Sequence, residues 1–171
     1  MRREAYSRFM AEPLRRLLRR FLLGAPPTGL ELVDVGLLPT SPEVNAQQHA
    51  ALRRIAAEAV ILQDQAEEVL RQVRAREGLG QVAPRGGPLV HRFYRLRDSL
   101  PARCDDPGNE RLRATLSVIL HHHAMLVATA LDLLAYEWRS ERVARSVETL
   151  DGFGDPGRRL DEVYAELAHV D

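Results

Sequence analysis

The sequence contains no lysine and only one cysteine, and both absences restrict what the chain can be. All 24 of its basic residues are arginines. Because arginine codons are GC-rich and lysine codons are not, this composition is typical of a bacterium with a GC-rich genome. Cys104 has no second cysteine with which to form an internal disulfide bond or a thiolate metal cluster. Together with the absence of a secretory signal at the N-terminus, the single cysteine predicts a reducing, cytoplasmic location.

Common catalytic and cofactor-binding motifs are absent as well. The sequence has no phosphate-binding P-loop, no G-x-S-x-G nucleophile motif and no C-x-x-C pair. Residues 78–83 match the pattern G-x-G-x-x-A, but they follow a predicted helix rather than the strand that a dinucleotide site requires. We therefore expect a protein that is not an enzyme and that binds no cofactor.

The residues that are present are typical of one globular domain. Hydrophobic residues make up 45% of the 171 positions and charged residues 28%, which are values of a folded protein rather than of a disordered tail. A chain of this length can bury a hydrophobic core without disulfide bonds or structural metals. Residues 1–171 are therefore predicted to form a single helical domain.

Helix signals dominate the sequence. Three Ser-Pro or Asp-Pro pairs place a capping oxygen before a proline that suits the first helical position, at residues 41–42, 106–107 and 155–156. Gly78 and Gly152 are placed to end helices in the left-handed conformation. Apolar residues then recur every three or four positions in five segments, which span about residues 1–23, 42–77, 89–100, 107–150 and 156–170.

These segments predict an all-α fold, a helical bundle of four to five helices. Residues 24–41 are expected to form an ordered crossover loop and residues 78–87 a mobile loop. The linker between the two very long helices, 42–77 and 107–150, has room for only one short helix. We therefore expect the two long helices to pack antiparallel to each other.

The longest uncharged stretch runs from Ala114 to Leu131, eighteen residues without a formal charge. It is predicted to be the fully buried middle of the central helix, with Leu126 at the middle of its widest apolar stripe. Its length also meets the lower limit for a membrane span. Three histidines at mid-span and the flanking Arg113 and Asp132 favour a buried helix of a soluble protein over that alternative.

Three consecutive histidines, His121, His122 and His123, lie in this stretch. Successive helical residues point about 100° apart, so these side chains cannot share one metal ion, and no metal site is predicted. His123 falls on the apolar seam and is expected to be buried and neutral. The alternative is a ligand-binding or pH-sensing site that His121, His122 and His123 form with Glu137 of the same helix.

Residues 1–23 are strongly basic, although the whole chain has a net charge of zero. Seven arginines against two glutamates give this segment a net charge of +5. Arg15, Arg16, Arg19 and Arg20 lie beside a Leu/Phe face, and we predict that they bind an acidic surface of a protein partner. An anionic membrane surface is a less favoured alternative, and the zero net charge disfavours nucleic acid. A further alternative is that the apolar face closes the bundle while the arginines are solvated.

These observations together predict a non-catalytic helical adaptor or accessory subunit that acts through protein–protein contacts. Its partners would be other proteins in a hetero-complex or further copies of itself in a homo-oligomer. Small helical bundles without chemistry often belong to multi-protein bacterial systems, so we expect a regulatory component of a defence or toxin-type system. The alternative function is a ligand- or metal-sensing bundle centred on His121–His123.

Overall fold

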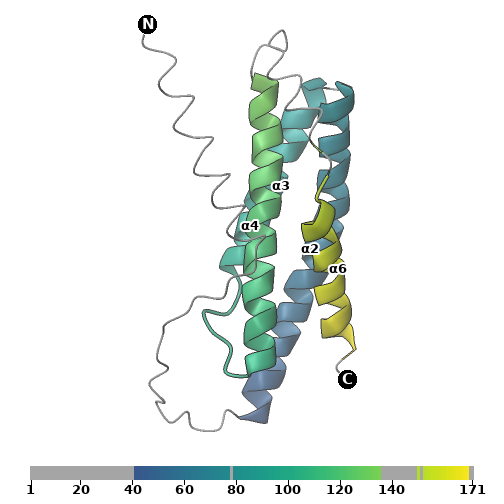
Figure 1. Ribbon diagram of the computed structural model, residues 1–171. Helices are drawn as coiled ribbons and strands as arrows, with labels where there is room; N and C mark the ends of the chain where they lie inside the picture. Colours follow the sequence, from purple (N-terminus) through teal and green to yellow (C-terminus); the bar gives the residue numbers. More distant parts are fainter. Residues whose placement is uncertain (1–40, 78, 136–149, 151, 170–171) are drawn as a thin grey trace, which may run out of the picture. The chain divides into compact units, whose positions relative to one another are not determined.

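The computed structural model describes residues 41–77, 79–135, 150 and 152–169, which form four helices (Figure 1). The helices are α2 (Pro42–Ala75), α3 (Leu79–Asp98), α4 (Pro107–Ala135) and α6 (Gly154–Ala168). All four lie in one compact unit, Pro39–Asp171, and no strand occurs among the residues described. The prediction of an all-α helical bundle is therefore confirmed. The helix predicted over 1–23, the predicted loop 24–41 up to residue 40, and residues 136–149 of the fourth predicted helix lie outside the described residues.

The helix ends follow the predicted caps in part. The Ser41 hydroxyl accepts a hydrogen bond from the Glu43 N–H at 3.3 Å, and Asp106 Oδ2 accepts one from the Asn109 N–H at 2.8 Å. Gly152 has the left-handed conformation predicted for it, with a φ of +74°. At the end of α2, Arg76 has a left-handed conformation with a φ of 58°, and Gly78 lies outside the described residues. The last helix begins at Gly154, before the predicted Asp155-Pro156 pair.

The helix α3 corrects the prediction of a mobile loop over residues 78–87 followed by a short helix from residue 89. It is one helix of 20 residues, although Pro84 and Pro88 lie inside it and each removes a backbone donor. Its buried residues are spaced three or four apart at Val82, Gly86, Leu89, Phe93 and Leu96. This apolar face packs on the bundle and offsets the low helix propensity of the glycines and prolines.

The full length of α3 changes the direction of the helix that follows it. His49 of α2 contacts Asn109 of α4, and Gln63 of α2 contacts His123 of α4. Early residues of α2 therefore contact early residues of α4, and later residues contact later ones. The helices α2 and α4 are therefore parallel (Figure 1), and the prediction that they are antiparallel is wrong. A helix of about 30 Å returns the chain to the end where α2 began before α4 starts.

The helices alternate in direction along the chain. Tyr94 of α3 contacts Met125 of α4, whereas Arg97, three residues later, contacts the earlier residue His121. On α6, the late residue Leu167 contacts the early α2 residue His49. The four described helices therefore run up, down, up and down, so each is antiparallel to the described helix before it.

The loop between α3 and α4 is held by one carboxylate. Glu110 Oε2 accepts a hydrogen bond from the Cys104 N–H at 2.8 Å, and both oxygens of Glu110 accept hydrogen bonds from Arg113 at 2.7 Å. These donors, Arg113 first, lower the pKa of Glu110 to about 2. Burial raises the pKa of the Cys104 thiol, so this cysteine is a packed, protonated side chain rather than a reactive thiolate.

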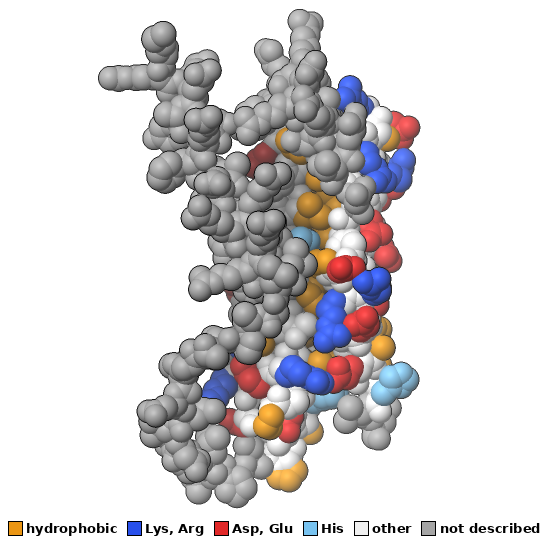
Figure 2. Space-filling view, viewed as in Figure 1, with side chains coloured by type: hydrophobic (Ala, Val, Ile, Leu, Met, Phe, Trp, Pro, Cys, Tyr) orange, Lys and Arg blue, Asp and Glu red, His pale blue; other side chains and the backbone are white. Residues whose placement is uncertain are grey.

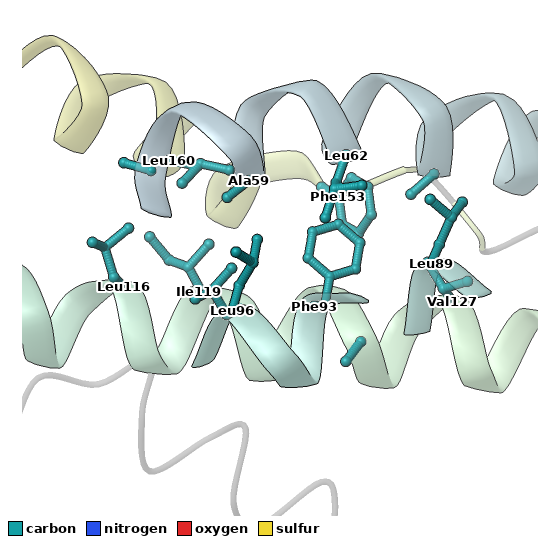
Figure 3. Close-up of a cluster of buried hydrophobic side chains, with 14 of the residues drawn as sticks. Ala59, Leu62, Leu89, Phe93, Leu96, Leu116, Ile119, Val127, Phe153 and Leu160 are labelled. Atoms are coloured by element: carbon teal, nitrogen blue, oxygen red, sulfur yellow. The ribbon is translucent and has the colours of Figure 1, made fainter. Parts of the chain in front are cut away.

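The hydrophobic core lies along the centre of the four helices (Figure 3). The buried residues of α4 are Leu112, Leu116, Ile119, Leu120, His123, Ala124, Val127 and Ala130. The expectation of a fully buried middle of this helix is wrong, because Val118 is 52% exposed and Met125 is 37% exposed. Leu126 is only partly buried and packs at the edge of the core. Of the described helices, α2, α3 and α6 pack on one side of α4, and none of them packs on the side that carries Val118 and Met125.

The burial of Leu120 and Leu126 predicts different costs for truncating each of them. Leu120 is 0% exposed, so Leu120→Ala should lower the free energy of unfolding by about 2–5 kcal/mol through lost transfer energy and a residual cavity. Leu126→Ala should cost clearly less, because solvent already reaches this side chain. Urea denaturation of both variants measures the difference. Equal costs would mean that Leu126 lies as deep in the core as Leu120.

The helix α4 is long and apolar enough to cross a membrane, with a mean hydropathy of 1.4 over its most apolar window. Length and composition alone are weak evidence, because a core helix of a soluble protein passes the same test. Here 39% of that window is buried inside the bundle. The buried part includes His123, whose polar ring is bonded to Gln63 of α2.

Candidate functional site

Among the residues that the structure describes, the most deeply buried polar side chain is the imidazole of His123. Its Nδ1 lies 2.9 Å from the carbonyl oxygen of Ile119, and its Nε2 lies 2.8 Å from Oε1 of Gln63. A neutral imidazole has one N–H donor and one acceptor nitrogen. If Nδ1–H donates to the Ile119 carbonyl, Nε2 must accept a hydrogen bond from Gln63. A half-turn of the Gln63 amide, which exchanges its oxygen and nitrogen, supplies that donor. Both ring nitrogens therefore have partners within the protein.

Two aromatic rings enclose the same imidazole. Phe153 stacks on His123 with ring centroids 3.8 Å apart, and Phe93 meets His123 edge-on at 5.3 Å. Figure 3 shows Phe93 pointing toward Phe153 between the helices. We call Gln63, Phe93, His123 and Phe153 the His123 cluster. It joins α2, α3, α4 and the turn before α6, so all four helices meet at one polar group.

Gly157 allows α6 to approach this cluster closely. A Cβ atom at Gly157 would lie 3.3 Å from Gln63 Oε1 and 2.9 Å from the Cβ atom of Phe153. The second distance is shorter than van der Waals contact, so a larger residue would strain the first turn of α6, and the first distance means that it would also press on the Gln63 amide. The small residue therefore fixes the distance at which α6 covers Gln63 and His123.

Burial controls the charge of His123. Loss of solvation lowers the pKa of this imidazole to about 4, and the hydrogen bond to the Ile119 carbonyl opposes that effect only in part. His123 is therefore neutral at pH 7, as its position on the apolar seam predicts. Leaving this buried polar group without partners would be costly. The bonds of His123 therefore favour the one packing of the helices in which Gln63 and the Ile119 carbonyl lie next to its ring.

His121 lies on the surface, in contact with α3. Its Nδ1 is 3.3 Å from the Arg97 guanidinium, which also lies over the ring of Tyr94 at 5.1 Å from the ring centroid. The Tyr94 hydroxyl donates to the sulfur of Met125 at 3.3 Å. Because a guanidinium can only donate, Nδ1 of His121 is the acceptor in this contact.

The three histidines point into three different environments. His121 is exposed, His122 is half-buried and His123 is buried. Burial, and to a smaller extent the neighbouring His121, lower the pKa of His122. Among the described residues no group of three or more His, Cys, Asp or Glu side chains converges on a point that could hold a metal ion. Glu137, the fourth residue of the predicted ligand or pH-sensing site, lies outside the described residues.

The predicted partner-binding arginines, Arg15, Arg16, Arg19 and Arg20, also lie outside the described residues. Their role therefore stays a prediction. The exposed surface that the structure does describe on α4 is different in character, because it carries almost no charge.

Every exposed residue of α4 after its first turn and up to Leu134 lies on one narrow strip. The α4 strip consists of Arg111, Ala114, Val118, His121, Met125, Thr129 and Asp132. At 100° per residue these positions span about 80° of the helix circumference. The five residues between Arg111 and Asp132 have no formal charge at neutral His121, and two of them are large and apolar.

The surface of α2 is different. Ile61 is the most exposed large hydrophobic residue described, at 58%, but Glu58 and Asp64 lie one turn to either side of it. Figure 2 shows acidic and basic side chains alternating over the face that carries α2 and α6. Single exposed hydrophobic residues among charges are normal, whereas the α4 strip carries Val118 and Met125 without a charged residue between them on the strip.

A second polar contact closes the end of the bundle where α2 and α4 begin. His49 Nδ1 lies 3.1 Å from Asn109 Oδ1, and its Nε2 lies 3.1 Å from the carbonyl oxygen of Leu167 near the end of α6. Asn109 also donates to the carbonyl oxygen of Asn45 at 3.3 Å. These bonds tie three helix ends together.

A pocket of about 580 Å³ adjoins these residues, lined by Asn45, His49, Arg53, Asp106, Leu112, Glu166 and their neighbours. Two acidic groups of the lining already have partners within the protein. Asp106 caps α4, and Glu166 pairs with Arg111. Its basic and acidic groups are mixed, so its lining does not specify the charge of a ligand.

Several residues of these sites were not identified from the sequence. Gln63 follows a core leucine and lies three or four residues from Ala59 and Ala66 of the apolar seam, which could have marked it as buried. His49 and Phe153 give no comparable signal, because their partners lie on other helices. Phe153 stands between two glycines of a turn and becomes part of the core only because α6 folds back.

No known protein family matches this chain, and no curated protein or solved structure shows significant similarity to it. What the His123 cluster and the α4 strip do is therefore inferred from their own geometry and chemistry. The first is enclosed and bonded within the protein, and the second faces solvent.

Proposed function

We propose that this chain is a non-catalytic helical module that acts through protein–protein contacts, as an adaptor or accessory subunit. The observation that carries the proposal is the α4 strip, an uncharged row of exposed side chains on a helix whose opposite side is packed. Val118 is 52% exposed and Met125 37% exposed, and covering both with a partner would remove apolar surface from water.

The interior polar groups support a structural rather than a chemical role for the core. His123 has protein partners at both ring nitrogens, stacks on Phe153 and meets Phe93 edge-on, so it has no free position for a substrate. His49 likewise has an oxygen atom within 3.1 Å of each ring nitrogen. Such bonds fix the relative positions of the helices and thereby present α4 as a rigid surface.

Capture of partners from the native host tests the proposal. Val118→Glu combined with Met125→Glu places two charges on the α4 strip and should reduce capture of specific partners roughly tenfold or more, the equivalent of 1.4 kcal/mol. Ile61→Glu is the matched control, because it adds a charge at an exposed apolar residue outside the strip. Far-UV circular dichroism should show equal helix content for all three proteins.

A second variant separates the α4 strip from the predicted N-terminal site. Replacing Arg15, Arg16, Arg19 and Arg20 with glutamine removes the basic surface and leaves the strip intact. Loss of capture in this variant alone, with the strip variant still binding every partner, would contradict the proposed role of α4. It would assign docking to the arginines instead.

A further inference from the structure

The residues at the two ends of the α4 strip follow the same spacing when each end is read inward. From Arg111, steps of three and four residues lead inward to Ala114 and Val118. From Asp132, steps of three and four residues lead inward to Thr129 and Met125. The three outer residues at each end are therefore spaced alike about a midpoint between His121 and His122, whereas His121 has no counterpart on the strip.

The two ends of the strip carry opposite charges. Arg111 is the basic end and Asp132 the acidic end, and the residues between them on the strip are uncharged. Arg111 is 65% exposed and pairs with Glu166, but a guanidinium has five N–H donors and can hold a second carboxylate. Asp132 pairs with no arginine in the described part of the chain.

We propose that the α4 strip binds a second copy of this chain, with the two α4 helices antiparallel across a two-fold axis between His121 and His122. This inference rests on the proposed function and names its partner. Antiparallel packing places Val118 opposite Met125 of the second copy and Ala114 opposite Thr129. It also places Arg111 opposite Asp132 at both ends.

Charge determines the direction of the second helix. Parallel packing in the same register would place Arg111 against Arg111 and Asp132 against Asp132, whereas antiparallel packing forms two opposite-charge pairs. The small residues Ala114 and Thr129 allow the helices to approach, and Val118 and Met125 then fill the space between them. With two large apolar residues per copy, the dimer should be reversible, with a Kd in roughly the micromolar range.

A charge-reversal cycle tests the pairing, with the full chain studied by sedimentation equilibrium. Asp132→Arg and Arg111→Asp should each raise the Kd of the dimer roughly tenfold, because each places like charges opposite each other twice. The double variant should return the Kd toward that of the unaltered chain. A double variant as weak as the single ones would overturn the proposed register, and Ile61→Glu should leave the Kd unchanged.

Cross-linking provides a test that does not depend on the charge variants. A mixture of Val118→Cys and Met125→Cys chains should form disulfide-linked heterodimers under mild oxidation, and neither chain alone should do so efficiently. Efficient cross-linking of Val118→Cys with itself would show parallel packing and overturn the proposal. The buried Cys104, present in every variant, serves as the background.

The failure of this inference can be distinguished from failure of the proposed function. If the unaltered chain stays monomeric at concentrations far above micromolar, the second copy is excluded as the partner. If the Val118→Glu, Met125→Glu variant still loses proteins that the unaltered chain captures, the strip is a contact surface for a different protein. If neither dimerisation nor capture depends on the strip, both proposals are wrong.

Discussion

Replacing Phe93 with alanine should lower the free energy of unfolding by about 3–5 kcal/mol, the largest single effect expected in this protein. Phe93 is 0% exposed and makes edge-on contacts with both His123 and Phe153. Its removal leaves a cavity at the point where all four helices meet, and it also removes one aromatic wall of a buried polar group. Urea or thermal denaturation followed by circular dichroism measures the loss.

Phe93→Leu is the matched control for this prediction. Leucine keeps most of the buried volume but loses the ring contacts, so its cost should be less than half that of alanine. If alanine and leucine cost the same, the aromatic contacts rather than the cavity would dominate. A cost for alanine near zero would contradict the position of Phe93 in the core.

Acidification from pH 6.5 to pH 4 should destabilise the protein, and His123 should account for roughly 3 kcal/mol of the loss. The folded chain holds the pKa of His123 at about 4, against 6.5 for an exposed histidine. Between these values the unfolded chain binds the proton and the folded chain does not, so protonation favours unfolding. The stabilisation is complete above pH 6.5 and decreases until the pH reaches the folded-state pKa.

His123→Leu isolates this contribution. The variant has no imidazole to protonate, so the difference in unfolding free energy between it and the unaltered protein should change across pH 6.5 to 4. Carboxylates titrate in the same range in both proteins and cancel in the comparison. An unchanged difference across this range would remove His123 from the account of acid sensitivity. A direct check is the pKa of His123 measured by NMR titration.

The sequence by itself determined the features that depend on near neighbours in the chain. Ser41 and Asp106 begin helices because their side-chain oxygens bond backbone donors two or three residues away. The apolar spacing of α2 predicted its core face, because residues three and four apart share a side of any helix. The same reasoning predicted that His123 is buried and that consecutive histidines diverge.

The tertiary structure alone decided how these helices are arranged. Pro84, Gly86 and Pro88 disfavour a helix locally, and contacts with the rest of the bundle make α3 helical over its whole length. Gly86 lies so close to α4 that a Cβ there would be 2.7 Å from a methyl group of Leu131. Because α3 is helical over its whole length, it returns the chain to the end where α2 begins. The helix α4 therefore runs parallel to α2.

Exposure along α4 also depended on the partners of that helix. Eighteen uncharged residues are equally consistent with burial on every side and with burial on one side, because composition does not specify how many helices pack around them. Three helices cover one side, so Leu120 and His123 are buried while Val118 and Met125 are exposed. Caps and periodicity act over a few residues of one chain segment, whereas direction and exposure result from contacts between segments that are far apart in sequence.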